Sequence, residues 1–366
     1  MHPTARLPRR GLRRRRLRIS GGVLAFAVTA GVAVISSHSA VGEAPEVLDS
    51  YRDQTIAESA AVAGSAASAV TAAEAPVGEG PRLDGPVPGT SASVTVHSGH
   101  RDRTAILSVP KDYYPNTPTP VLFAYPGYRQ TASDMQRFAA LDRLPAIVVY
   151  MQGVGDAWEG APYAQTSDGE DVRFTTDVLA SLNSTYNIDA SRIYATGMSN
   201  GGGFAAKLAC RVPDVFAAVA SVSGAYYPGT GGNCVTPSTS FLEMHGVRDE
   251  TINYGGGTRH GVSYQSARGR AEAVAARNGC GPDPVTTALA GDVRRVQWPM
   301  CRGGRDVVHL RVGDGGHTWP GDATGASAVV DRGPAAASDA AEVTSYSLDA
   351  TTEVWAFVSA HRLAPR

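Results

Sequence analysis

The sequence has little charge, few aromatic residues and few cysteines for its length. Only 18% of its 366 residues are charged and 7% are aromatic, whereas 43% are hydrophobic. Disordered chains combine low hydrophobicity with high net charge, so this composition excludes a chain that is disordered throughout. A chain of this length forms two domains or one large one, and it is long enough to bury a core.

The formal net charge of −1 is spread unevenly along the chain. Residues 1–18 hold eight of the 33 basic residues, all arginines, and residues 1–40 hold no Asp or Glu. The remaining 25 basic residues face 34 acidic ones, which leaves a charge of −9 on the rest of the chain. A surface that follows nucleic-acid phosphates needs excess positive charge, so this balance argues against nucleic acid as a partner.

Residues 1–40 are typical of a secretion signal. The arginines precede a mostly apolar run at residues 21–35, and small residues follow at 36–40. This order is the layout of a secretory signal, and the apolar run is shorter than the about 20 residues of a membrane span. We therefore predict a secreted, extracellular protein. The alternative is an uncleaved N-terminal anchor, which would be the chain's only contact with a membrane.

The chain has four cysteines, an even number that favours disulfides in an exported protein. Four cysteines allow three connectivities, and sequential pairing is the one that closes two local loops of similar size. We favour that arrangement. No Cys-x-x-Cys or histidine cluster accompanies the cysteines, so we expect no metal site. The predicted pairs are Cys210–Cys234 and Cys280–Cys301.

Residues 41–90 are rich in Ala, Ser, Gly and Pro and lack the spaced large apolar residues that build a core. We predict that they form a linker. Their one aromatic residue, Tyr51, is too little for a carbohydrate- or polymer-binding platform.

From residue 91 onward, apolar strands alternate with amphipathic helices. Strands that are apolar throughout indicate a mostly parallel sheet with helices on both faces, and we predict one α/β domain over residues 91–366. Helices are expected at 171–186, at 201–210 and after an N-cap at Asp349. The expected strands are 93–97, 105–109, 121–125, 146–150, 192–196, 216–222, 241–245 and 307–312.

The most specific motif is a Gly-x-Ser-x-Gly centred on Ser199. A predicted strand enters it and a predicted helix leaves it, which is the setting of a nucleophile elbow. There the serine occupies a strained turn, and the flanking glycines, Gly197 and Gly201, allow the neighbouring backbone to pass close by. We predict Ser199 as a nucleophile.

A serine hydroxyl needs a base to remove its proton and a carboxylate to orient that base. Of the histidines after Ser199, His317 lies in a glycine-rich loop just beyond the strand at 307–312. We predict it as the base. His245 and His309 are expected to be structural, and His361 belongs to the last helix.

The orienting carboxylate should follow another strand end. Asp249 comes shortly after the strand at 241–245 and is our prediction. Glu250 is its rival, and Asp314 is a weaker one because it is too close to His317 in sequence to come from a separate strand. The oxyanion hole needs backbone N–H groups, and we predict those of Asn200 and Tyr128.

These motifs resemble one known family. Gly197-Met198-Ser199-Asn200-Gly201-Gly202, His245-Gly246-x-x-Asp249 and Gly315-Gly316-His317-Thr318-Trp319-Pro320-Gly321 are similar to the polyhydroxybutyrate depolymerase and feruloyl esterase group of secreted α/β-hydrolases, which are carbohydrate-esterase-family-one-like enzymes. The resemblance covers about residues 93–362. It implies a triad of Ser199, Asp249 and His317, and the sequential disulfides. The family usually carries His-Gly at the oxyanion loop, where this chain has Pro126-Gly127.

The resemblance implies a serine esterase that works through an acyl-enzyme and needs no cofactor. We expect poly- or oligo(3-hydroxybutyrate) esters as substrates and a monomeric enzyme. The alternative substrate is a feruloyl or acetyl ester on plant polysaccharide, and the non-enzymatic alternative is a surface binding protein on an inactive hydrolase scaffold. Trp158 and Trp319 are predicted to line an acyl pocket, the alternative being that they only pack the loops.

Overall fold

The computed structural model describes residues 82–328 and 342–364. The predicted signal, and the predicted linker up to residue 81, lie outside the described residues. The described end of that linker packs on the domain that follows it. The N–H of Leu83 donates to Thr185 Oγ1 at 2.9 Å, and the Leu83 side chain lies against the core. The folded domain therefore includes Leu83, ahead of the predicted boundary at residue 91.

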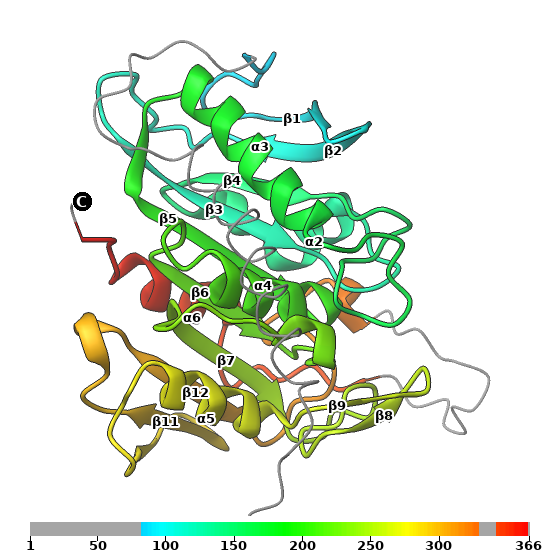
Figure 1. Cartoon of the computed structure of the whole chain (residues 1–366), viewed down its shortest axis with the longest axis vertical. Helices are drawn as coiled ribbons and strands as arrows, with labels where there is room; N and C mark the ends of the chain where they lie inside the picture. Colours follow the sequence, from blue (N-terminus) through cyan, green and yellow to red (C-terminus); the bar gives the residue numbers. More distant parts are fainter. Residues whose placement is uncertain (1–81, 329–341, 365–366) are drawn as a thin grey trace, which may run out of the picture. The chain divides into compact units, whose positions relative to one another are not determined.

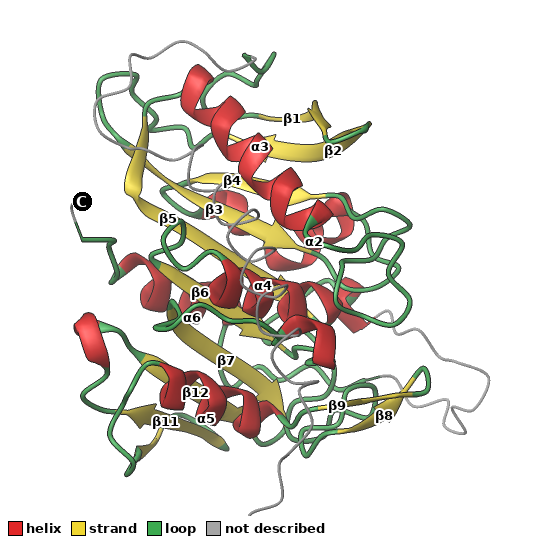
Figure 2. Cartoon of the chain, in the orientation of Figure 1, coloured by secondary structure: helices red, strands yellow, loops and turns green. Residues whose placement is uncertain are grey.

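A ten-stranded sheet forms the centre of the domain (Figures 1 and 2). Its six central strands are parallel, and antiparallel pairs close both edges. A separate small hairpin joins β8 (Gly257–Arg259) and β9 (Val262–Tyr264). In order across the large sheet, the strands are β1 (Ser91–Ser98), β2 (Arg101–Ser108), β4 (Ile147–Met151), β3 (Thr119–Tyr125), β5 (Ile188–Met198), β6 (Ala218–Val222), β7 (Ser240–Gly246), β12 (Val307–Val312), β11 (Val293–Trp298) and β10 (Val285–Ala288).

Helices cover both faces of this sheet. Side chains of α3 (Glu170–Thr185), α4 (Asn200–Arg211) and α5 (Ala267–Arg277) join one buried hydrophobic cluster. Side chains of α2 (Ala132–Ala139) and α6 (Ala350–Ser359) join the other. The predicted fold class, a mostly parallel α/β sheet with helices on both faces, is confirmed.

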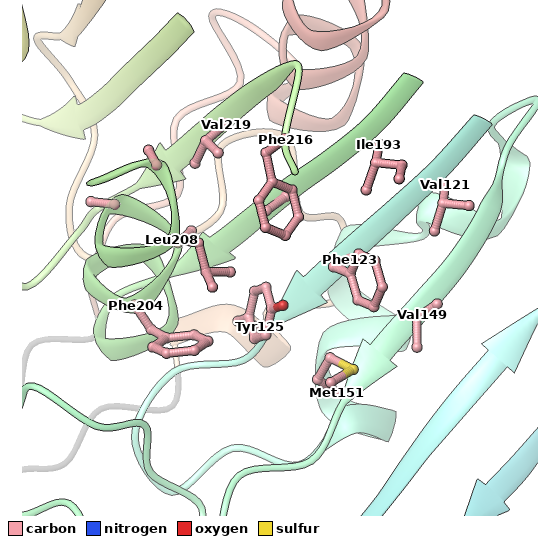
Figure 3. Close-up of a cluster of buried hydrophobic side chains, with 14 of the residues drawn as sticks. Val121, Phe123, Tyr125, Val149, Met151, Ile193, Phe204, Leu208, Phe216 and Val219 are labelled. Atoms are coloured by element: carbon pink, nitrogen blue, oxygen red, sulfur yellow. The ribbon is translucent and has the colours of Figure 1, made fainter. Parts of the chain in front are cut away.

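The central strands are mostly apolar because each contributes to both clusters. In β3, Val121, Phe123 and Tyr125 enter the first cluster, and Leu122 and Ala124 enter the second. Successive strand residues point to opposite faces, so a strand buried on both sides is apolar at most positions on either face. Figure 3 shows the first cluster, in which the strand side chains meet those of α4.

Most of the predicted elements are present, with shifted ends. The predicted helices at 171–186 and 201–210 correspond to α3 and α4. Asp349 caps α6 as predicted, since its side chain accepts from the N–H of Thr352 at 2.7 Å. The elements after residue 255 that have little apolar periodicity were not predicted: β8, β9, β10, β11 and α5.

Both predicted disulfides are present, Cys210–Cys234 and Cys280–Cys301. The first ties the last turn of α4 to the loop before β7, and the second ties the end of α5 to the segment between β11 and β12. Within residues 82–328 and 342–364, none of the helices combines the length and the apolar character needed to cross a membrane.

Candidate active site

Ser199 occupies the sharp turn between β5 and α4. Its backbone has φ 55° and ψ −120°, in the left-handed half of conformational space that non-glycine residues rarely enter. Both flanking glycines are required by close backbone contacts. A β-carbon on Gly197 would lie 2.3 Å from the carbonyl oxygen of Gly201, and one on Gly201 would lie 2.0 Å from that of Tyr125. The turn therefore has the geometry of a nucleophile elbow.

Asp249 and His317 meet at the carboxyl ends of two neighbouring parallel strands, β7 and β12. His317 Nδ1 lies 2.7 Å from Asp249 Oδ2, and both residues are buried, with 4% and 3% of their surface exposed. The other oxygen of Asp249 accepts from the backbone N–H groups of Thr251 and Ile252. The carboxylate is thereby fixed on one side by backbone and on the other by the imidazole.

The pKa of Asp249 reflects two opposed effects. Burial raises the pKa of this carboxyl, but the charges and hydrogen bonds of His317 and His245 outweigh it and hold the pKa well below its usual range. Asp249 is therefore a carboxylate at neutral pH, as the orienting member of a triad must be.

The rival residues lie elsewhere. Glu250 is exposed, and the carboxylate of Asp314 accepts from the hydroxyl groups of Ser345 and Ser347. His361 bonds to the carbonyl of Phe357 and to Asp306. His309, whose ring bonds to Glu243, belongs to a buried network described below.

Ser199 and His317 line one pocket, together with Gly127 and Tyr128 from the loop after β3. Aromatic side chains from separate loops are among its lining residues and form an aromatic wall. The rings of Tyr128 and Tyr163 stack at 3.9 Å, and His260 meets the Tyr163 ring edge-on at 4.7 Å. The sequence motifs did not indicate Tyr163 or His260, because their loops converge only in the folded chain.

The loop after β3 provides one candidate oxyanion donor. The N–H of Gly127 donates to Gln130 Oε1 at 2.8 Å, that of Arg129 to the carbonyl of Asp156 at 2.9 Å, and that of Gln130 to the carbonyl of Gly127 at 3.2 Å. Among the described residues, the N–H of Tyr128 has no such acceptor. The loop is adjacent to the serine, since a β-carbon on Gly127 would lie 3.3 Å from Ser199 Cβ.

Asn200 provides the second candidate donor. It is the first residue of α4, so its N–H has no acceptor within the helix. Its side chain is buried and bonds to the backbone of Trp158 through both of its polar atoms: Oδ1 accepts from the N–H at 2.8 Å, and Nδ2 donates to the carbonyl at 3.3 Å. Asn200 is thus held rigidly beside Ser199.

The prediction that Trp158 and Trp319 line the pocket is wrong. Trp158 is fully buried, and its Nε1 donates to the carbonyl of Pro126 at 2.9 Å. Trp319 is 1% exposed, and its Nε1 donates to Thr351 Oγ1 at 3.0 Å. Both indoles turn into the core, where their rings pack and their N–H groups find acceptors, and neither is among the residues that line the pocket.

A buried polar network continues from Asp249 into the sheet. His245 Nε2 lies 3.0 Å from Asp249 Oδ2, and its Nδ1 lies 3.1 Å from Glu243 Oε1. The other oxygen of Glu243 lies 2.5 Å from His309 Nδ1, and His309 Nε2 lies 2.7 Å from the hydroxyl of Tyr254. Glu243 and His309 are aligned by the register of β7 and β12.

In this network, burial and the hydrogen-bonding partners shift the pKa values of the side chains in opposite directions. Burial raises the pKa of Glu243, but the charge of His309 and hydrogen bonds from both histidines outweigh it, and the pKa falls to about 2. Burial lowers the pKa of His245, but its bonds to Asp249 and Glu243 raise it to about 10. Within the described part of the chain, no group of His, Cys, Asp or Glu side chains has a metal-binding arrangement.

One family model, several curated relatives and one solved structure with esterase names are similar to this chain. The sequence model of the Esterase family matches residues 97–319, more than half of the chain. Feruloyl esterase B of Piromyces equi is 28% identical over 232 residues, which cover 59% of this chain but only 42% of that protein. Feruloyl esterase D of Neurospora crassa is 28% identical over 263 residues, 66% of this chain and 81% of that protein.

Among solved structures, acetyl xylan esterase from Aspergillus awamori matches with a TM-score of 0.50. The match is 17% identical and covers 63% of this chain and 94% of that one. It supports the fold alone.

Proposed function

This chain belongs to the Esterase family, and on that premise we propose that it is a secreted serine esterase acting on feruloyl-type esters of plant polysaccharide. One observation carries the proposal: the pocket that contains Ser199 and His317 has a wall of stacked aromatic rings. The two disulfides and the signal-like composition of residues 1–40 support export.

In the proposed reaction, Ser199 Oγ attacks the ester carbonyl while His317 Nε2 accepts the serine proton. Asp249 holds His317 through Nδ1, which leaves Nε2 as the nitrogen that can accept the serine proton. The N–H groups of Tyr128 and Asn200 stabilise the negative charge on the carbonyl oxygen. His317 then protonates the leaving alcohol. Water, activated by the same imidazole, releases the acid from the acyl-enzyme.

The aromatic wall supports a ring-bearing acyl group. Stacked and edge-on aromatic contacts contribute about 0.5–1.5 kcal/mol each beyond the area that they bury. Tyr128 and Tyr163 present such surfaces beside Ser199, and His260 extends them toward solvent. The relatives from Piromyces equi and Neurospora crassa are named feruloyl esterases, and a feruloyl group carries an aromatic ring.

The expectation of 3-hydroxybutyrate esters has no support among the comparisons. An aliphatic hydroxy acid has no ring to stack on Tyr128 and Tyr163, so the pocket also favours the alternative substrate. The inactive-scaffold alternative is disfavoured, since a buried carboxylate bonded to His317 is costly to keep without a use.

The test is product release by the full chain from three substrates side by side: methyl ferulate, acetylated xylan and 3-hydroxybutyrate oligomers. We expect ferulate release, with Ser199→Ala lower in kcat by at least about three orders of magnitude. Release from the oligomers alone would restore the polyester reading, and release of acetate alone would make the enzyme an acetyl esterase. Failure of a fluorophosphonate probe to label Ser199 would overturn the esterase proposal itself.

A variant of the aromatic wall makes this test more specific. Tyr163→Ala should raise KM for methyl ferulate by about tenfold, as loss of one or two ring contacts implies, and leave KM for p-nitrophenyl acetate unchanged. Tyr114→Ala is the matched control, because Tyr114 is 65% exposed and precedes β3 at the opposite end from the pocket. Equal changes for both substrates would exclude a role for Tyr163 in acyl recognition.

A further inference from the structure

His245 is buried at the end of β7, and among the described residues the atoms that face its two ring nitrogens are all hydrogen-bond acceptors. Nδ1 faces Glu243 Oε1 at 3.1 Å, and Nε2 faces both Asp249 Oδ2 at 3.0 Å and the carbonyl oxygen of Ile252 at 2.8 Å. A neutral imidazole has one N–H and one lone pair, so one nitrogen would direct its lone pair at a carboxylate oxygen. Two N–H groups satisfy all three contacts.

Neither neighbouring carboxylate is a site for the second proton in place of the His245 ring. Asp249 Oδ1 accepts from two backbone N–H groups, those of Thr251 and Ile252, and Oδ2 faces the imidazoles of His245 and His317. Glu243 Oε1 faces His245 and the hydroxyl of Tyr226, while Oε2 faces His309. Every oxygen already accepts, so the ring is the site for the charge.

We propose that His245 is a permanently protonated second partner of Asp249, a positioning residue that shares this carboxylate with His317 and so sets the pH at which the active site becomes basic. The proposal rests on the proposed function, in which His317 is the base. It differs from the expectation that His245 is only a packed residue, because it assigns a charge to the ring and an effect on the reaction.

The electrostatic reason for this effect is that the negative Asp249 carboxylate lies between two imidazoles, those of His317 and His245. A lone Asp249 carboxylate would stabilise the protonated form of His317 strongly. The positive ring of His245, 3.0 Å from the same oxygen, cancels part of that attraction. The attraction between Asp249 and a positive charge on His317 is thereby weaker, and we expect the esterase to be active further into the acid range.

The other groups around His245 leave this balance in place. Glu243 on β7 is the counter-ion of Nδ1, and His309 on β12 contacts Glu243 but not Asp249. Tyr254 lies with its ring 6.1 Å from that of His245. Tyr226 bonds to Glu243, and Arg270 of α5 lies 4.9 Å from the Tyr226 ring. Burial raises the pKa of both tyrosines, so they are neutral across the working range.

The test compares His245→Gln with wild type by the rate at which a fluorophosphonate labels Ser199 between pH 4 and 9. We expect the midpoint of the acid limb to rise by about one pH unit in the variant. His309→Gln is the matched control, since it removes a buried imidazole from Glu243 without touching Asp249, and its midpoint should stay within about 0.3 pH units of wild type.

Each result has one meaning. A labelled His245→Gln enzyme with an unmoved or lowered midpoint overturns the role of His245, whereas an unlabelled wild type overturns the proposed function. If His245→Gln does not fold, ¹⁵N-histidine spectra of the wild-type full chain at pH 8 decide the matter, because exposed histidines are neutral there. At least one ring with both nitrogens protonated that is retained in His309→Gln supports the proposal. Spectra with only neutral rings, or loss of that signal in His309→Gln, overturn it.

Discussion

The two sides of the candidate active site are supported by different kinds of contact. On the side of Ser199, at the ends of β3 and β5, the indole of Trp158 stacks on Phe204 at 5.3 Å and meets the Tyr125 ring edge-on at 5.0 Å. Tyr125 and Phe204 are neighbours in the cluster of Figure 3. The other side is that of His317, at the ends of β7 and β12. Here the buried charges of Glu243, His245 and Asp249 take the place of apolar packing, and we call it the ionic side.

The two sides control different properties of the site. One controls only the positions of its groups, and the other also controls the electrostatic potential at His317. The side of Ser199 fixes where the proposed oxyanion donors lie, because Trp158 packs in the apolar cluster and hydrogen-bonds to both Pro126 and Asn200, and none of these groups titrates. The ionic side fixes the position of His317 and also the electric field that acts on it. Variants on the two sides should therefore differ in pH dependence even when they lose similar activity.

The largest effect is expected from Trp158→Ala. Removing a fully buried indole should lower the free energy of unfolding by about 3–5 kcal/mol. Displacement of the oxyanion loop should lower kcat about 100-fold. Urea unfolding and kcat for p-nitrophenyl acetate measure the two effects.

Trp158→Phe is a more conservative substitution at the same position. It keeps the ring stack but leaves the carbonyl of Pro126 without its donor, at about 1–3 kcal/mol. Neither variant should move the acid limb of the pH–rate profile. A shift like that expected for His245→Gln would contradict the separation of the two sides.

The sequence predicts the Ser199 side and the fold well for a shared physical reason. Apolar strands and the Gly-x-Ser-x-Gly turn are local patterns, and a short stretch of chain carries the information for each. Where the indole of Trp158 points depends instead on Phe204 and Pro126, which are distant in sequence, and that prediction failed.

The ionic side is harder to predict because it depends on strand pairing. Glu243 and His309 meet only because β7 and β12 are parallel neighbours in one register. The helix α5 was missed because its sequence has a weak apolar face, and its Arg270 is buried over the Tyr226 ring. No spacing of residues along the chain predicts either contact.

The ionic side should also make stability depend on pH. His245 has a pKa of about 10 in the folded protein, above the ordinary value of 6.5. Its contribution is complete below about pH 6.5 and is lost as the pH rises through 10, by up to about 1.4 kcal/mol per pH unit. Glu243, with a pKa lowered to about 2, contributes above its ordinary value of 4.5 and loses its contribution as the pH falls toward 2.

Urea unfolding of the full chain at pH 6, 7.5 and 9 measures the alkaline branch before tyrosine ionisation intervenes. The free energy of unfolding should fall across this range in wild type and in Trp158→Phe, and much less in His245→Gln. An equal slope in all three proteins would mean that His245 is not the group that titrates.

The smallest effect is expected at Glu342, which links the two loops of the ionic side. Its Oε2 accepts from the backbone N–H of His317 at 2.8 Å, and its Oε1 accepts from Thr251 Oγ1 at 2.9 Å. Glu342→Gln retains the shape and can keep both contacts, with its amide oxygen accepting from His317 and its amide nitrogen donating to Thr251, but it replaces hydrogen bonds to a charged carboxylate by weaker neutral ones, at about 0.5–1.5 kcal/mol. We expect kcat for p-nitrophenyl acetate to fall by about two- to tenfold with KM nearly unchanged.

Glu353→Gln, in the first turn of α6, is the matched control and should behave as wild type. A Glu342→Gln enzyme with wild-type kcat would mean that the backbone alone positions His317, and the ionic side would then act only through its field.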